Sequence, residues 1–215
     1  MIINYIFFME IFININGVLR NLIQKFDYHY KDAYLMSEFE TENDFEYGIV
    51  NPIQNDNILK SYKFQTPDEF EYFMFVEYPI EIFGHAGVSY PTAISDLNKL
   101  IHENPEHNFT VVTVDELGKS KPSTLFFLSK NAFLGNNIKF IKSEDLSKEW
   151  EKCDIWVSDD KRIIDLKPEN KIAVKFNTIY NEFFTSEIEI TKLIEIEKLW
   201  STSLEKAITS TSTES

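Results

Sequence analysis

The stretch from Phe12 to Asn21 places two asparagines where an apolar strand gives way to a helical pattern. The apolar run stops at Asn14, Asn16 follows after one residue, and Gly17 permits a tight turn. Amide side chains donate and accept hydrogen bonds but carry no charge. A neutral amide is a poor nucleophile and exchanges no proton near neutral pH, so these two residues predict no turnover of their own.

Two more apolar strands are predicted to end in polar residues. One ends at Thr113, and the other is followed by the paired acids Asp159 and Asp160. Parallel sheets place their sites at the carboxyl ends of strands, so we expect these groups to lie near Asn14.

In this order, the three strand ends resemble the motifs of the haloacid dehalogenase (HAD) superfamily, over most of Glu10–Asn181. In that family the first strand ends in Asp-x-Asp-Gly, where the first aspartate attacks phosphorus and the second moves a proton. The resemblance places Asn14 at the nucleophile and Asn16 at the acid/base. Both carboxylates are thus absent from the sequence.

The resemblance also implies roles for the other strand ends. Thr113 would bind a phosphoryl oxygen, and Lys142 or Lys119 would neutralise phosphate charge. Asp159 and Asp160 would be the remnant of a Mg²⁺ site. Each pattern also has an ordinary structural explanation, because Asn and Gly favour turns after strands and an aspartate pair can cap a helix.

The missing carboxylates have two predicted consequences. Mg²⁺ prefers anionic oxygens, so the affinity of the strand-end site for Mg²⁺ should fall sharply. No cofactor is therefore expected, and Mg²⁺ would be required only if activity is retained. Loss of like-charge repulsion at the strand ends should let the fold persist without metal. Deamidation could restore one of the two carboxylates, at position 16, because Asn16-Gly17 is a sequence prone to this reaction.

Composition limits the possible classes of function. The chain has 215 residues, 43% of them hydrophobic and 15% aromatic, and a net charge of −14. The acidic surface disfavours nucleic-acid binding. Residues 1–13 are too short for a membrane span and lack the features of a secretory signal, and Met9 is an alternative start to Met1. The single cysteine suits a reducing compartment, and we expect a cytoplasmic location, or a virion if a phage encodes the chain.

Alternating strands and helices predict an α/β fold: a HAD-like, Rossmann-like three-layer parallel sheet with a small cap-like insert and a C-terminal helix. The predicted core comprises residues 1–26 and 79–181, with residues 27–78 as the insert and 182–215 as a helical extension. A helix is expected from Val18 to Phe26, and another from Pro67 to about Val76 with Thr66 as its N-cap. The aromatic residues of the insert either line a ligand pocket or form a small core of their own.

The last predicted helix, Glu187–Ile208, has more apolar surface than a free helix needs. It either packs on its own domain or docks on a protein partner. We therefore expect a non-catalytic protein that is a structural or interaction component of an assembly, such as a phage virion. The alternatives are a Mg²⁺-dependent phosphatase or nucleotidase of the HAD type, and a sensor that binds a phosphorylated ligand without cleaving it.

Overall fold

A parallel sheet forms the centre of the protein. The computed structural model describes residues 8–36, 46–49 and 58–199. Six strands lie in the order β5-β4-β1-β6-β7-β8, and every pair is parallel. The strands are β1 (Glu10–Asn14), β4 (Asn108–Val114), β5 (Ile138–Ile141), β6 (Ile155–Ser158), β7 (Ile172–Phe176) and β8 (Glu189–Ile190). The predicted α/β fold with a parallel sheet is confirmed.

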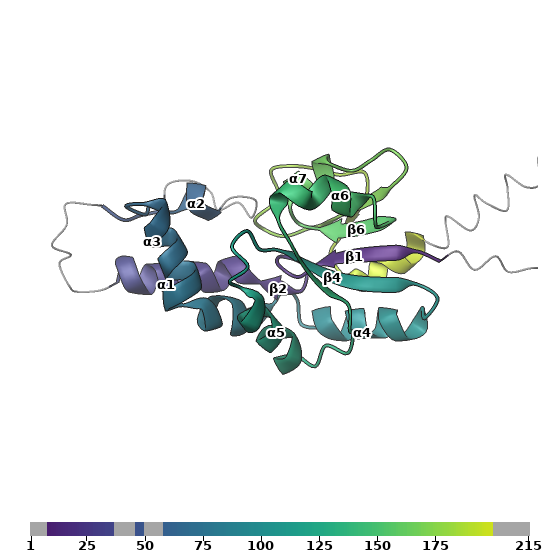
Figure 1. Cartoon of the computed structure of the whole chain (residues 1–215), viewed down its shortest axis with the longest axis horizontal. Coiled ribbons are helices and arrows are strands. Elements are labelled where there is room, and N and C mark those ends of the chain that lie inside the picture. Colours follow the sequence, from purple (N-terminus) through teal and green to yellow (C-terminus); the bar gives the residue numbers. More distant parts are fainter. Residues whose placement is uncertain (1–7, 37–45, 50–57, 200–215) are drawn as a thin grey trace, which may run out of the picture.

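Helices cover both faces of this sheet, which makes three layers (Figure 1). On one face, α4 (Ala93–Glu103) and α5 (Lys121–Lys130) pack on alternate residues of β1, including Ile11 and Ile13. On the other, α6 (Leu146–Trp150) and α7 (Lys161–Asp165) pack on Phe12. Both faces of β1 are apolar because both are buried, as in other central parallel strands.

The order of the strands determines where a site can lie. The chain passes from β1 to β4 and β5 on one side, then returns to β6, β7 and β8 on the other side of β1. The carboxyl end of β1 is therefore the switch point of the sheet, where open α/β sheets form a crevice. Asn14 is the last residue of β1 and Ser158 the last residue of β6.

The insert leaves the core through a short antiparallel pair, β2 (Arg20–Asn21) with β3 (Gly87–Val88). Its helices are α1 (Leu22–Tyr34), α2 (Ile58–Ser61) and α3 (Pro67–Tyr72), which is capped by Thr66 as predicted. Two π-helical turns follow, η1 (Phe73–Glu77) and η2 (Ile80–Gly84). Figure 1 shows α1, α2 and α3 together at one end of the molecule, beyond the sheet.

The aromatic residues of the insert form a hydrophobic core separate from the two cores of the sheet. Phe26 and Tyr30 of α1 lie at its centre and contact Tyr62 and Phe73 at ring-centroid distances of 4.8–6.4 Å. Of the two predicted roles for these aromatics, the small core is therefore confirmed. Helix α1 also crosses the boundary that the sequence placed at residue 26.

The prediction of a helix over Val18–Phe26 was wrong for the first turn of that range. Residues 18 and 19 lie in a turn, Arg20 and Asn21 form β2, and the helix begins at Leu22. The Asn21 side chain accepts a hydrogen bond from the Gln24 backbone N–H at 3.2 Å and so caps the helix there. Val18 and Leu19 are buried, but against the core of the sheet and not along a helical face.

The helix expected over Glu187–Ile208 was also wrong where the structure describes it. Glu189 and Ile190 form the edge strand β8, and Leu193–Ile196 form a 3₁₀ turn, η4. Alternation of Ile188 and Ile190 competes with the helical spacing, and pairing with β7 decides the outcome. Ile190, Leu193 and Ile196 belong to the main core, so this segment is part of the sheet domain and not a separate helical extension. Residues 200–208 lie outside the described residues.

Within the described residues, we find no helix that combines the length and the apolar character needed to cross a bilayer.

Candidate functional site

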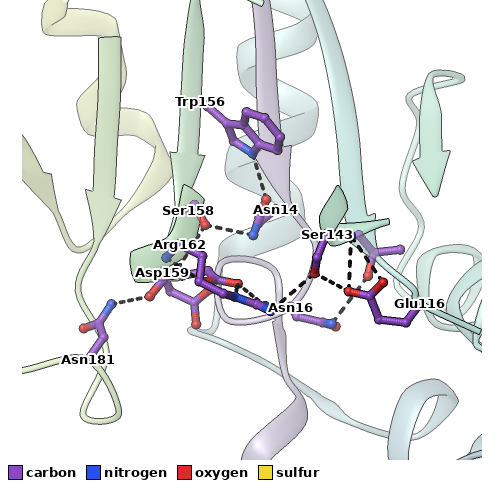
Figure 2. Close-up of polar contacts among 11 residues, drawn as sticks. Asn14, Asn16, Glu116, Ser143, Trp156, Ser158, Asp159, Arg162 and Asn181 are labelled. Carbon is purple, nitrogen blue, oxygen red and sulfur yellow. Dashed lines mark hydrogen bonds and ion pairs between the residues drawn. The ribbon is translucent and has the colours of Figure 1, made fainter. Parts of the chain in front are cut away.

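The Asn14 side chain is held by two neighbours from β6 (Figure 2). Its Oδ1 accepts a hydrogen bond from the Trp156 indole N–H at 2.8 Å, and its Nδ2 donates to Ser158 Oγ at 2.8 Å. Because an indole can only donate, the oxygen must face Trp156, which fixes the orientation of the amide. Asn14 is 5% exposed. Its oxygen and its amino group are therefore both engaged inside the protein.

Asn16 binds a buried arginine. Its Oδ1 accepts from both Nε and Nη2 of Arg20, at 3.0 and 2.5 Å, and its Nδ2 lies 3.4 Å from Thr113 Oγ1. Arg20 also donates from Nη1 to the Phe83 carbonyl oxygen at 2.8 Å and to Thr124 Oγ1 at 3.1 Å. Arg20 therefore joins the strand-end turn to the insert and to α5.

Arg20 is fully buried. Its guanidinium lies over the rings of Phe83 and Phe127, at 5.2 and 5.3 Å from their centroids. Burial lowers the pKa of Arg20 to about 9, and the carboxylate of Asp115 opposes that shift. A cation held this way lacks the directly bonded carboxylate that usually accompanies a buried arginine.

The turn after β1 leaves no room for a side chain at Gly17. Gly17 has a φ of +76°, and a Cβ built there would lie 1.7 Å from Asp159 Oδ2. The Asp159 carboxylate therefore packs directly on the Asn14–Gly17 turn, as the resemblance expects of the strand ends.

Replacing Gly17 by alanine should destabilise the protein by about 2–4 kcal/mol, because backbone strain adds to a clash with Asp159. Gly118→Ala is the matched control, since Gly118 has a similar φ of +66° but no atom lies within 4 Å of where its Cβ would be. Urea unfolding of both variants separates the clash from the strain. Equal losses in the two variants would show that Asp159 does not occupy this position.

Asp160 follows Asp159 but has a different environment. Its Oδ1 accepts from the Arg162 backbone N–H at 2.9 Å and caps α7, and its Oδ2 lies 2.6 Å from Arg162 Nη2. Arg162 Nη1 lies 3.3 Å from Ser143 Oγ, which in turn hydrogen-bonds to Glu116. Figure 2 shows this chain of contacts running across the strand ends beside Asn16.

The predicted phosphate-binding residues are not brought together. Thr113 is buried at the end of β4 and lies next to Asn16. Lys142 is more than half exposed and pairs with Glu144 at 3.6 Å, and Lys119 is exposed. Neither lysine lines the cavity described below.

A cavity of about 1130 Å³ opens at these strand ends and extends beneath the insert. Its floor includes Asn14, Asn16, Thr113, Asp159 and Asp160. Seven aromatic residues line it, and α3 and η1 of the insert contribute to its walls. The aromatic lining residues are Phe70, Phe75, Phe83, Tyr90, Phe176, Tyr180 and Phe184.

The residues at the strand ends do not fit the Mg²⁺ that the resemblance implies. Among the described residues, no three His, Cys, Asp or Glu side chains gather as a metal ion would require. Mg²⁺ binds through one or two carboxylates plus a substrate phosphate. Here the Asn14 oxygen is bonded to Trp156, and one of the two predicted carboxylates, that of Asp160, is bonded to Arg162.

Sequence reasoning missed two residues of this site that share a visible signal. The chain contains 19 lysines but only two arginines, Arg20 and Arg162, and both lie at the strand ends. Arginine and lysine differ in that only arginine presents a planar fork of donors. A lysine-rich chain that uses arginine twice therefore indicates two places where forked hydrogen bonding is needed.

Comparison with solved structures gives a match over most of the chain. A protein of Burkholderia xenovorans LB400, described as a haloacid dehalogenase-like hydrolase, superposes with a TM-score of 0.54 and 12% sequence identity. The match covers 89% of this chain and 97% of that one. No protein-family model matches the sequence, and no curated protein matches it. The HAD-like, Rossmann-type α/β fold is thereby shown, and at this identity the likeness concerns the fold alone.

Proposed function

We propose that this chain of HAD-like fold acts by binding and not by turnover, as a structural or interaction component of a larger assembly. The observation that carries the proposal is the Asn14 amide, which is uncharged and held on both sides by Trp156 and Ser158. Phosphoryl transfer in a HAD-like site needs an anionic carboxylate at this point.

The second amide supports the same proposal. Asn16 cannot exchange a proton, and its oxygen is bonded to a guanidinium. Loss of one catalytic group from a set that acts together costs several orders of magnitude in rate. Loss of two leaves no measurable turnover.

The proposed partner is another protein. The described end of the chain packs on the sheet through Leu193 and Ile196, so these two side chains are not available to a partner. A phage virion and a cytoplasmic complex are both assemblies of the proposed kind. Purification from the native source tests this, because a chain that elutes as a free monomer at its native concentration would contradict an assembly role.

Two alternatives remain to be compared with this proposal. A Mg²⁺-dependent phosphatase or nucleotidase would need a nucleophile other than Asn14. A phosphate sensor would need a cation that is available to phosphate at the strand ends, whereas Lys142 pairs with Glu144 and Arg162 pairs with Asp160. Both alternatives require an anion to enter a cavity whose lining contains more acids than bases.

The unmodified protein should not hydrolyse para-nitrophenyl phosphate or nucleoside monophosphates above the blank, with or without Mg²⁺. EDTA should leave its melting temperature unchanged, because no cluster of carboxylates in the part of the chain that the structure describes requires a cation. The measurement is phosphate release together with a thermal scan, and Asn14→Asp/Asn16→Asp is the matched variant. Hydrolysis by protein that mass spectrometry shows to be free of deamidation, or a large EDTA-dependent drop, would overturn the proposal.

A further inference from the structure

The cavity at the strand ends is strongly acidic. Its lining includes two basic residues and seven acidic ones, namely Glu71, Asp115, Glu116, Asp159, Asp160, Glu182 and Glu189. Both basic residues already have acidic partners in the same lining. Arg162 pairs with Asp160 at 2.6 Å, and Lys175 lies 3.5 Å from Glu189 and 2.5 Å from the Phe184 carbonyl oxygen. The lining therefore has an excess of negative charge, which attracts cations and repels anions.

One of these carboxylates has an unmade hydrogen bond. Asp115 is 6% exposed, and its Oδ2 accepts from the backbone N–H and the hydroxyl of Ser120, at 2.9 and 2.8 Å. Its Oδ1 is buried and has no hydrogen-bond partner. A buried acceptor left without a donor is unfavourable, so the Asp115 carboxylate, whose charge also acts on the Arg20 guanidinium, retains unused hydrogen-bonding capacity beside the cavity.

The acids are spread over the cavity and not gathered at one point. Glu71 lies on α3 of the insert, Asp115 and Glu116 follow β4, Asp159 follows β6, and Glu182 lies between β7 and β8. This spacing does not suit a single compact divalent ion, in line with the lack of a three-ligand group among the described residues. It suits an extended ligand with more than one positive charge.

The aromatic walls add a second property. Phe70 and Phe75 from the insert face the same cavity as Tyr90, Phe176 and Tyr180 from the core. Aromatic faces attract ammonium groups and also pack against methylene chains. Acidic and aromatic residues together therefore match an aliphatic chain that carries charged amines.

We propose that this cavity binds an organic polycation, a linear aliphatic molecule with two or more ammonium groups, through Asp115, Glu71 and Glu182. The inference rests on the proposed function, since it names the ligand class of a site that binds without turnover. Occupancy would bridge α3 of the insert and the strand ends of the core, because acids of both contribute to the lining.

Isothermal titration of the full chain with spermidine tests the proposal, with 1,6-hexanediol as the uncharged comparison. We expect one spermidine per chain, no binding of the diol, and affinity that falls as salt rises. Asp115→Asn should weaken binding at least tenfold, because the asparagine oxygen can still accept from Ser120 while the charge is lost. Glu71→Gln and Glu182→Gln should each weaken it about threefold, since each removes one negative charge from the wall and keeps the shape of the side chain.

Glu169→Gln is the control, since Glu169 is exposed and outside the lining. A stoichiometry well above one, or equal effects of Glu169→Gln and Glu182→Gln, would show general attraction to an acidic surface and overturn the proposal. So would absence of spermidine binding, or tight binding of Mg²⁺ alone or of a nucleoside monophosphate. If spermidine does not bind and no phosphate is released, this inference is wrong but the proposed function stands. If phosphate is released, the proposed function is contradicted whether or not spermidine binds.

Discussion

Replacing Arg20 by methionine should lower the free energy of unfolding by about 3 kcal/mol, among the largest effects expected of a single substitution in this chain. Methionine matches the length of the arginine stem but supplies no donor. The Phe83 carbonyl, Thr124 Oγ1 and Asn16 Oδ1 would all lose a buried hydrogen bond. Each unsatisfied buried acceptor costs about 1–3 kcal/mol.

An opposing effect reduces this loss but does not cancel it. Removing a fully buried guanidinium also removes its desolvation penalty, which is the cause of its lowered pKa. Replacing a buried ion pair by apolar groups can be neutral when both partners leave together. Here the three acceptors stay in place, and one of them belongs to the main chain of the insert, so the net effect remains destabilising.

Guanidinium chloride unfolding measures the change, with Lys148→Met as the surface control because the Lys148 side chain is 73% exposed. The control should change stability by less than about 0.5 kcal/mol. The stability of Arg20→Lys should be intermediate, since lysine keeps the charge but lacks the planar fork of donors that bonds to the Asn16 oxygen. An Arg20→Met protein as stable as the original would contradict this prediction, because the three contacts would then do no more than offset the desolvation penalty of the guanidinium.

Much of the fold was predictable from the sequence because apolar residues dominate the central strands. The strands that end near Asn14, Thr113 and Ser158 lie within a residue or two of their predicted positions. Burial on both faces makes such runs easy to recognise. The capped helix at Thr66 was predictable for a local reason, the Thr-Pro pair with Glu69 nearby.

The errors arose where long-range pairing competes with local pattern. Residues 187–192 have helical spacing in part, but β7 offers an open edge and Ile190 pairs there. Val18 and Leu19 also have helical spacing, yet the Leu19 and Arg20 backbone N–H groups both donate to the Ile15 carbonyl, which closes a turn before the helix. No local propensity contains this information.

The candidate site likewise has features that the sequence predicts and features that depend on long-range strand pairing. The order of the strand ends predicted that Asn14, Thr113 and Asp159 meet at one edge. The contact of Trp156 with Asn14 spans 142 residues in sequence and depends on the register that sets Phe12 beside Trp156. Because side chains alternate along a strand, that register places Asn14 and Ser158 on one face as well. Only the assembled sheet shows that the oxygen and the nitrogen of the Asn14 amide are both bonded.

Replacing Asn16 by aspartate should stabilise the protein, by about 1–2 kcal/mol. Arg20 is fully buried and now donates twice to one uncharged oxygen. A carboxylate would accept Nε and Nη2 on separate oxygens, and charge-assisted forked bonds are roughly twice as strong as neutral ones. Repulsion from the nearby Asp159 opposes the gain. Attraction between the new carboxylate and the buried Arg20 guanidinium is the stronger interaction, because these two groups are hydrogen-bonded to each other.

The sign of this effect can be tied to Arg20 by a double-mutant cycle. In the Arg20→Met background, Asn16→Asp should become destabilising, because it then buries a carboxylate without a cation. Spontaneous deamidation at Asn16-Gly17 gives the same residue, but it requires the Gly17 nitrogen to attack the Asn16 side chain. In the folded protein that N–H donates to the Arg20 carbonyl at 2.8 Å, and the Asn16 oxygen is bonded to the guanidinium. Deamidation should therefore be slow in the native protein and faster in Arg20→Met, as mass spectrometry of aged samples can measure. If Asn16→Asp is instead destabilising while Arg20 is present, Arg20 does not need a counter-charge, and its two aromatic neighbours and three acceptors suffice to hold it.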